Sequence, residues 1–452
     1  MRFVLPISVI SRTPKNKSIV FWEASKFPYY KMKEIGENIT TLAGYWALKN
    51  KGDELSEWQN VGLWVMPEKE LVEDSKVSRA EGVTIWDSSF LSYIPEEQER
   101  MVDTAIAKYE EVFGEIPECV GSYHFPPEVI NHLEGYGVKV AIGYCWEQSL
   151  AGLTNIGSPL FPYYPSKRNS LRPVKSRDIL LVGYASRDPI HGYLIDPTSF
   201  SSCVDDIYDR RPGHRDPIAT PEDMGYLNRL YAGYMEQERW NRYTYFMLIN
   251  ETDVFDIGYR SAVAGVNREI FSEQVEYIKK ANGNFTQLAE FARQVKENCK
   301  DMVSRIVWRD ILDEKGRVMW YSDTAMRVCI FLDTMSIWDI RNYALELPYG
   351  PRYSAVLDKR ENRYLLCEKN FEFITNEKDR IELKEGTVSF REGALEIDME
   401  IEYRPIGIRI RKIKGGLVLD SGWTFAFLED AEYSNGMIKG PFVLKCMESV
   451  EF

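Results

Sequence analysis

The first 300 residues alternate short apolar segments with longer amphipathic ones, and this alternation limits the folds that the chain can adopt. The apolar segments expected to be strands are Val4–Ile10, Ile19–Trp22, Val61–Met66, Val83–Ile85, Cys119–Tyr123, Val138–Tyr144, Ile179–Tyr184 and Tyr243–Ile249. Helical spacing of apolar residues occurs over Lys31–Asn50, Glu96–Phe113, Pro127–Tyr136 and Pro221–Trp240. Because repeated strand–helix–strand units pair in parallel through helical crossovers, the pattern predicts an α/β fold, a (β/α) barrel of about seven parallel strands.

An open, doubly wound sheet is the alternative that this pattern leaves. The nucleotide-binding form of that fold carries a G-x-G-x-x-G turn after the first strand, or a P-loop. The sequence contains neither motif in that place, which favours the barrel.

The pattern changes near residue 304, where short apolar segments begin to follow one another closely and long helical patterns disappear. Turn sequences such as Glu385-Gly386 and Gly415-Gly416 separate these segments. The expected strands are Val318–Tyr321, Met326–Leu332, Tyr364–Glu368, Phe371–Ile374, Thr387–Arg391, Leu395–Tyr403, Ile406–Ile413, Leu417–Leu419 and Phe442–Met447. Such spacing is typical of an antiparallel β-sandwich, so we predict a barrel domain over residues 1–303 and a β-sandwich domain over residues 304–452.

Charge and residue usage narrow the classes of partner and cofactor. The formal net charge is −13 at pH 7, whereas nucleic acids and anionic membranes attract a positive surface, so neither is an expected partner. The seven cysteines form no C-x-x-C pair and the four histidines form no H-E-x-x-H or H-x-x-x-H motif, so we expect no disulfide, zinc site or cofactor. A site for a hard cation, built from Asp and Glu side chains, is an alternative that the sequence leaves.

The apolar start Phe3–Ile10 is too short for a membrane span, and we expect a cytoplasmic protein.

Candidate functional residues follow the predicted strands, because the active site of a parallel barrel lies at the C-terminal ends of its strands. They are Trp22, Glu23, Trp86, Asp87, His124, Trp146, Glu147, Asp188, His191 and Glu251. Tryptophan rings stack on sugar rings, and paired carboxylates supply an acid and a base or nucleophile, so this set suits a carbohydrate ligand. A charged residue after a strand can equally cap a helix, and His124 can equally be a hydrogen-bonded core histidine.

The segment Phe161–Lys167 places two tyrosines between prolines and forms a stiff loop. Tyr163 and Tyr164 can line a sugar pocket, and Lys167 can bind a hydroxyl group. The alternative is a rigid loop whose tyrosines pack in the core.

The segment Glu96–Trp146 resembles the middle of the polysaccharide deacetylase-like barrels. Its helix ends in Phe113–Pro117, the next strand leads to His124-Phe-Pro, and Gly135–Val138 precedes the strand after that. The deacetylases show a similar G-x-x-P…P…L-x-x-x-G rhythm.

Two further segments are similar to a less characterised bacterial branch of the glycoside hydrolase/deacetylase superfamily. Tyr144–Gln148 matches its tryptophan-containing strand end, and Phe161–Lys167 matches its Y-P-Y-Y-P-S-K-like loop. A later strand of that branch ends in Trp-Glu, where this chain has Asn250-Glu251. The resemblance covers about residues 15–280 and implies a barrel with a β-rich domain behind it.

The metal-dependent deacetylases need an Asp-Asp pair after the first strand and an H-x-x-x-H motif, and this chain has neither. The resemblance therefore favours a glycosidase, which uses two carboxylates and acts on an oligo- or polysaccharide. In this hypothesis Glu147 is the nucleophile, Glu251 or Asp188 is the acid/base, and both glutamates share a cleft near Trp146 and Tyr164. The alternatives are a metal-dependent polysaccharide deacetylase and a non-catalytic sugar-binding protein on a degenerate barrel.

Overall fold

The structure is a computed structural model. It describes residues 1–10, 18–78, 90, 93–144, 162–168, 170, 173–191, 201–204, 221–257, 264–299, 303–312, 316–324, 326–331, 336–342, 381–391, 394–403, 410–413, 416–419, 423–427, 432–434 and 437–446. These residues fall into two compact units, with the first break after residue 300. Each unit is described by itself.

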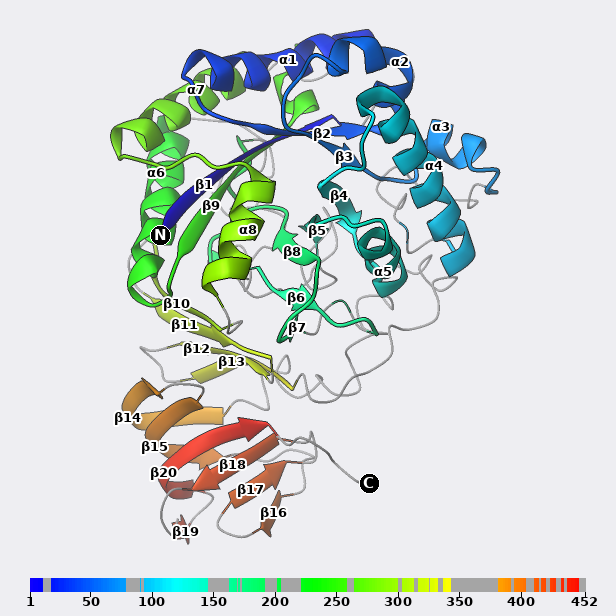
Figure 1. Cartoon of the computed structure of the whole chain (residues 1–452). Helices are drawn as coiled ribbons and strands as arrows, with labels where there is room; N and C mark the ends of the chain where they lie inside the picture. The colour runs from blue at the N-terminus through cyan, green and yellow to red at the C-terminus, as the bar shows by residue number, and fades with distance from the viewer. Residues whose placement is uncertain are drawn as a thin grey trace. The chain divides into compact units, whose positions relative to one another are not determined.

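The first unit is built on a seven-stranded parallel sheet that curls into a half-barrel (Figure 1). Its strands are β1 (Arg2–Ile10), β2 (Thr40–Gly44), β3 (Val61–Trp64), β4 (Cys119–His124), β5 (Val140–Tyr144), β8 (Leu180–Gly183) and β9 (Thr244–Glu251). Their order is β8-β5-β4-β3-β2-β1-β9, and every neighbouring pair is parallel. The predicted α/β class and the seven parallel strands are therefore confirmed, and β8 and β9 are the two edges of the sheet.

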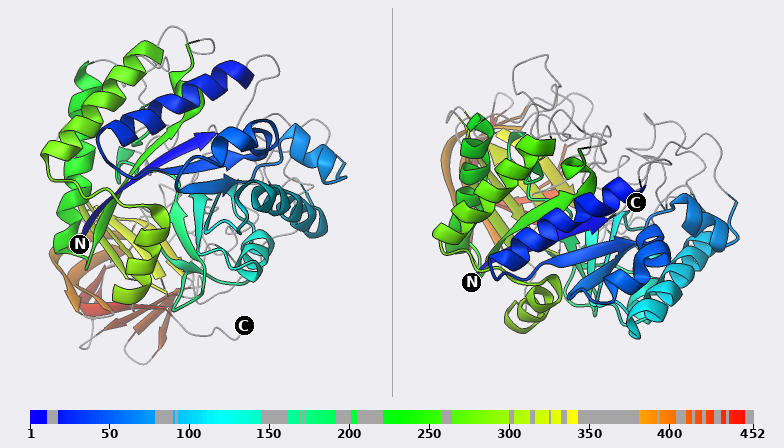
Figure 2. Two further views of the ribbon diagram at one scale, coloured as in Figure 1. Left: turned by 45° about the horizontal axis from the view of Figure 1, so that its top comes forward. Right: turned by 90° about the horizontal axis from the view of Figure 1, so that it is seen from above.

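Helices lie outside the curled sheet (Figure 2). They are α1 (Ser18–Glu34), α2 (Tyr45–Leu55), α3 (Lys69–Asp74), α4 (Pro95–Phe113), α5 (Pro127–Gly135), α6 (Pro221–Glu236) and α7 (Ala264–Lys280), with short 3₁₀ turns η5 (Gln237–Arg239) and η6 (Thr252–Phe255). The helix predicted over Glu96–Phe113 is confirmed as α4. It ends because Gly114 adopts φ 75°, a left-handed conformation that glycine tolerates.

The strand expected over Ile19–Trp22 is wrong, because these residues begin helix α1. Ile19 and Val20 are exposed, whereas the residues that follow are buried at a helical spacing: Phe21, Trp22, Ala24, Ser25, Tyr29 and Met32. A run of four apolar residues fits a helix as well as a strand. The helix expected over Lys31–Asn50 is wrong in part for a related reason, since it runs across strand β2 and the start of α2.

Helix α8 (Leu288–Asn298) covers the N-terminal end of the half-barrel (Figure 1). The ring of Phe291 lies 5.3 Å from the rings of Phe3 and Tyr245, which are register partners on β1 and β9. Because side chains alternate between the two faces of a strand, Val9 and Glu251, an even number of residues further along, share this interior face. Helix α8 therefore lies at one end of the half-barrel, and Glu251 lies at the other.

The second unit consists of antiparallel strands. They are β10 (Ser304–Arg309), β11 (Arg317–Ser322), β12 (Met326–Phe331), β13 (Ser336–Asn342), β14 (Ile381–Arg391), β15 (Ala394–Tyr403), β16 (Ile410–Ile413), β17 (Gly416–Leu419), β18 (Trp423–Phe427), β19 (Glu432–Ser434) and β20 (Met437–Cys446). They pair in the order β10-β11-β12-β13-β14-β15-β20-β18-β17-β16, with β19 beside β20. The strands expected over Tyr364–Glu368 and Phe371–Ile374 lie outside the described residues, and the β-sandwich stays a prediction.

Candidate functional site

Three side chains from strands that are not neighbours in the sheet meet at the C-terminal end of the half-barrel. The hydroxyl group of Tyr184, which follows β8, donates a hydrogen bond of 2.7 Å to Oε1 of Glu251, the last residue of β9. The ring of Trp64, the last residue of β3, lies 5.7 Å from the ring of Tyr184 at an interplanar angle of 53°. Trp64 and Tyr184 are buried, whereas Glu251 is partly exposed. The arrangement presents a carboxylate to solvent with buried aromatic groups behind it.

The chain after β8 turns back along the free edge of β9. Oγ of Ser186 accepts a hydrogen bond of 2.9 Å from the backbone N–H of Met247, and the backbone of Ser186 is itself bonded to Ser202. Tyr184 and Ser186 thus meet Glu251 and Met247 in opposite chain directions. Side-chain contacts bridge the two sheet edges, whose strands are not paired with each other.

Asp188 lies in the same segment and is fully buried. Its Oδ1 accepts hydrogen bonds from the backbone N–H groups of Ile190 at 2.8 Å and His191 at 3.0 Å. This is the pattern of an Asx turn, in which an aspartate side chain shapes the following backbone. The predicted site residues Asp188 and His191 are therefore neighbours, and Oδ1 of Asp188 has a structural role.

Trp22 and Glu23 lie in helix α1, on the outer layer. Trp22 is buried, its ring stacks on that of Trp58 at 5.5 Å, and its Nε1 donates to Oε2 of Glu54 at 3.0 Å. Glu23 is exposed and pairs with Lys26 at 3.2 Å. The structure does not bring these residues to Glu251, because the segment forms a helix instead of the strand that would have delivered them.

The loop with the two tyrosines lies toward the opposite end of the half-barrel. Tyr163 pairs with Leu181 in an antiparallel bridge, so the chain beyond it runs toward the N-terminal end of β8. Both Tyr163 and Tyr164 are buried, and the backbone carbonyls that follow them accept hydrogen bonds from Arg177, just before β8, and from Asn131 of α5. This part of the loop therefore lies near the N-terminal end of β8, whereas Glu251 is the last residue of β9.

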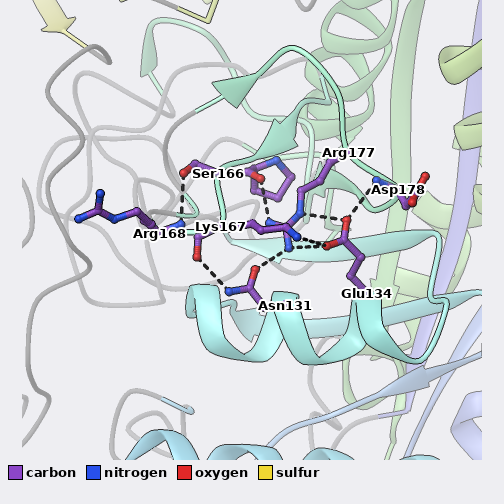
Figure 3. A network of polar contacts seen from close by, with 8 residues as sticks. Asn131, Glu134, Ser166, Lys167, Arg168, Arg177 and Asp178 are labelled. Atoms are coloured by element: carbon purple, nitrogen blue, oxygen red, sulfur yellow. Dashed lines mark hydrogen bonds and ion pairs between the residues drawn. The ribbon is translucent and has the colours of Figure 1, made fainter.

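Lys167 belongs to a polar network that joins this loop to α5 (Figure 3). Arg177 binds both carboxylate oxygens of Glu134, at 3.0 and 2.9 Å, and donates to Asn131 and to the carbonyl of Pro165. Nζ of Lys167 is 4.0 Å from Glu134 and mostly exposed. Burial raises the pKa of Glu134, but its bonds from Arg177 outweigh that effect and hold the pKa below the usual value. The network joins the loop to α5 and contains none of the three residues that meet at the C-terminal end of the half-barrel.

Of the remaining predicted site residues, Trp86, Asp87, Trp146 and Glu147 lie outside the described residues. His124 ends β4, so its backbone lies at the same end of the sheet as Glu251.

Sequence reasoning missed Trp64, Tyr184 and Glu68. Tyr184 ends the predicted strand Ile179–Tyr184, so the strand-end rule applied to every strand would have found it. Trp64 lies inside the predicted strand Val61–Met66, and the rule finds it only once β3 is known to end at residue 64. Glu68 follows β3, and its Oε1 accepts a hydrogen bond of 2.8 Å from the backbone N–H of Trp46 at the start of α2. Burial raises the pKa of Glu68 to about 8.

The described residues contain no group of three His, Cys, Asp or Glu side chains placed to hold a metal ion. Four cysteines in this part of the chain are buried thiols: Cys119, Cys203, Cys299 and Cys329. Among the helices described, none is both long and apolar enough to cross a membrane.

Taken together, the curled parallel sheet of seven strands, with helices outside it and a carboxylate at its C-terminal end, is a glycoside hydrolase/deacetylase-like fold, as the resemblance predicts. One solved structure with this fold is from Parabacteroides distasonis and is described as a glycoside hydrolase/deacetylase. It has a TM-score of 0.56 and 15% sequence identity, over 77% of this chain and 86% of that one.

Other solved structures align less well. Puue allantoinase has a TM-score of 0.40 and 12% identity over 66% of this chain and 91% of that one. A protein from Mycobacterium smegmatis described as a polysaccharide deacetylase has a TM-score of 0.38 and 10% identity over 66% and 90%. No family model and no curated protein sequence matches the chain.

Proposed function

We propose that this protein is a carbohydrate-active hydrolase, and more narrowly a glycosidase, in which Glu251 is one of two catalytic carboxylates. The observation that carries the proposal is the hydrogen bond of 2.7 Å from Tyr184 to Glu251, which fixes a partly exposed carboxylate at the C-terminal end of a parallel half-barrel. Active sites of parallel barrels lie at that end. The fold shared with a protein described as a glycoside hydrolase/deacetylase supports the same class of substrate, an oligo- or polysaccharide.

The second carboxylate in this proposal is Glu147, which follows β5 and acts as the nucleophile. A glycosidase needs two carboxyl groups on opposite sides of the scissile bond, about 5 to 10 Å apart. Glu251 is the acid/base in preference to Asp188, since Oδ1 of Asp188 is engaged by two backbone N–H groups. The antiparallel unit after residue 303 is proposed to be the β-sandwich that accompanies the barrel.

The test is a screen of the full chain against chromogenic glycosides and acetylated sugars, followed by the variant Glu251→Gln. Loss of a general acid or base lowers turnover by about 10²- to 10⁴-fold, and Glu251→Gln should show a loss of that size on the best glycoside. Glu269→Gln, on the exposed side of α7, is the matched control and should keep full activity.

Each alternative function gives a distinct result in this screen. Release of acetate without glycoside cleavage would identify a deacetylase. Saturable sugar binding without turnover would identify a binding protein. A glycosidase whose Glu251→Gln variant keeps wild-type turnover would exclude Glu251 from the chemistry.

A further inference from the structure

The hydrogen bond to the carboxylate of Glu251 comes from the opposite edge of the sheet. Glu251 ends β9, Tyr184 directly follows β8 and Trp64 ends β3, and neither β8 nor β3 neighbours β9 in the sheet. The chain of contacts runs from Trp64 to Tyr184 through the rings and from Tyr184 to Glu251 through the hydrogen bond of 2.7 Å. Three separate strand ends are therefore joined across the interior.

The position of Trp64 depends in turn on a glycine of the neighbouring strand. Trp64 and Gly121 are register partners on β3 and β4. A Cβ atom on Gly121 would lie 2.5 Å from Cε3 of Trp64 and 2.6 Å from Cδ1 of Leu42. These distances are shorter than any real carbon–carbon contact, so the indole ring occupies the space that a side chain at residue 121 would need.

We propose that Tyr184 is a positioning residue for Glu251, and that Trp64, seated against Gly121, holds Tyr184 in place. This inference rests on the proposed function, because positioning matters where the carboxylate does chemistry. A hydrogen bond to an ionised carboxylate is stronger than one between neutral groups, and it restricts the carboxylate to one orientation. Trp64 and Tyr184 are both buried, so the donor has little freedom to move away.

The primary test compares Tyr184→Phe with Tyr109→Phe. Each change removes one hydroxyl group and keeps the ring. Tyr109 is a matched control, since it is also buried and its hydroxyl donates to the carbonyl of Val61 at 2.6 Å, at the start of β3. On the glycoside that the wild type cleaves best, Tyr184→Phe should lower kcat by about 10- to 100-fold, with KM nearly unchanged. Tyr109→Phe should leave kcat unchanged.

A second pair of variants tests the contact between Gly121 and Trp64. Gly121→Ala displaces Trp64 and should also lower kcat with little change in KM, although residue 121 does not touch Glu251. Gly135→Ala, where an added Cβ meets nothing within 4 Å, should behave as the wild type. Gly121→Ala also tests folding, so its circular dichroism spectrum is compared with that of the wild type before kcat is measured.

A spectroscopic readout separates this inference from the proposed function. The carbon resonance of the Glu251 carboxyl group, assigned by its loss in Glu251→Gln, is compared among the variants at one fixed pH. Removing the hydrogen bond from Tyr184 changes the surroundings of the carboxylate, so this resonance should shift in Tyr184→Phe and keep its wild-type position in Tyr109→Phe. If no glycoside is cleaved but the resonance shifts, the proposed function fails and the contact between Tyr184 and Glu251 stands. An unchanged kcat or an unchanged resonance in Tyr184→Phe overturns the positioning role.

Discussion

Oγ of Ser186 accepts a hydrogen bond of 2.9 Å from the backbone N–H of Met247 and so occupies the place that a neighbouring strand would take along β9. Met247 lies in the middle of β9, whose other edge is fully paired with β1. An unpaired N–H group in this buried position would cost about 1–3 kcal/mol, and the serine removes that cost without an eighth strand.

Removal of one partner from the ion pair between Arg177 and Glu134 should destabilise the protein. Arg177→Met leaves the carboxylate of Glu134 without its bidentate partner, and we expect the free energy of unfolding to fall by about 2–4 kcal/mol at pH 7. Urea unfolding at several pH values measures this.

The same pair predicts a pH dependence. The folded pKa of Glu134 lies below its ordinary value of 4.5, so the pair contributes fully above pH 4.5 and is lost as pH falls through the lowered pKa. The difference between the wild type and Arg177→Met should therefore shrink in acid. Arg239→Met, at an exposed pair with Glu236, is the control and should change stability by less than about 0.5 kcal/mol. Equal losses for the two variants would contradict the prediction.

Glu68 should make the protein less stable as pH rises. Its folded pKa is about 8 whereas the ordinary value is 4.5, so the folded state retains a proton that the unfolded state has released between these values. Stability should fall from about pH 4.5 to about pH 8. The variant Glu68→Gln keeps an acceptor for the N–H of Trp46 but has no charge, and its stability should fall less over this range.

The matched control for Glu68 is the exposed Glu57. Glu57→Gln should follow the pH dependence of the wild type in the same thermal unfolding series. A Glu68→Gln curve parallel to that of the wild type would show that Glu68 titrates normally.

Thr41 and Thr244 should respond in opposite ways to the same substitution. Both are strand residues without exposed surface. Oγ1 of Thr41 has no hydrogen-bond partner among the residues described, whereas Oγ1 of Thr244 donates to the carbonyl of Tyr234 at 2.6 Å. Replacing a buried polar atom that lacks a partner by a methyl group of similar size removes a desolvation penalty. Thr41→Val should therefore raise the free energy of unfolding by about 1 kcal/mol, and Thr244→Val should lower it by about 1 kcal/mol. A loss of stability in Thr41→Val would show that its hydroxyl is satisfied.

Gly143 on β5 should not tolerate a side chain. An added Cβ would lie 2.1 Å from the backbone oxygen of Ser122 and 2.7 Å from Cε2 of Phe125. Since the nearest atom belongs to the backbone of the paired strand β4, it cannot move aside, and Gly143→Ala should destabilise the protein by about 3 kcal/mol or prevent folding. Gly135→Ala is again the control. Folded Gly143→Ala with wild-type stability would contradict the close packing of β4 on β5.

The sequence predicts those helices and strands whose local signals all favour the same structure. Helix α4 combines a proline at its start, acidic residues in its first turn and a glycine after its end, and it is where these signals place it. Strand β5 is the continuous apolar run Val-Ala-Ile-Gly-Tyr, as expected for a strand inside a parallel sheet.

The predictions from the sequence fail where contacts between distant residues determine the local structure. Trp22 was expected to end a strand, but its ring is packed between helices by Trp58, a contact that the local sequence cannot reveal. Lys167 was expected to bind a hydroxyl group of the sugar, but the antiparallel bridge from Tyr163 to Leu181 directs its loop toward the start of β8. Glu251 was found because β9 is a long apolar strand. Its hydrogen bond with Tyr184 could not be predicted, because it joins two edges of the sheet whose distance depends on how far the sheet curls.

Helix α8 has a consequence for how any polymer could be handled. With Phe291 packed on Phe3 and Tyr245, α8 lies across the end of the half-barrel that is opposite to Glu251. A ligand in the proposed role would therefore approach Glu251 from the C-terminal ends of the strands. A polymer would lie across these strand ends, and would not run along the axis of the curled sheet.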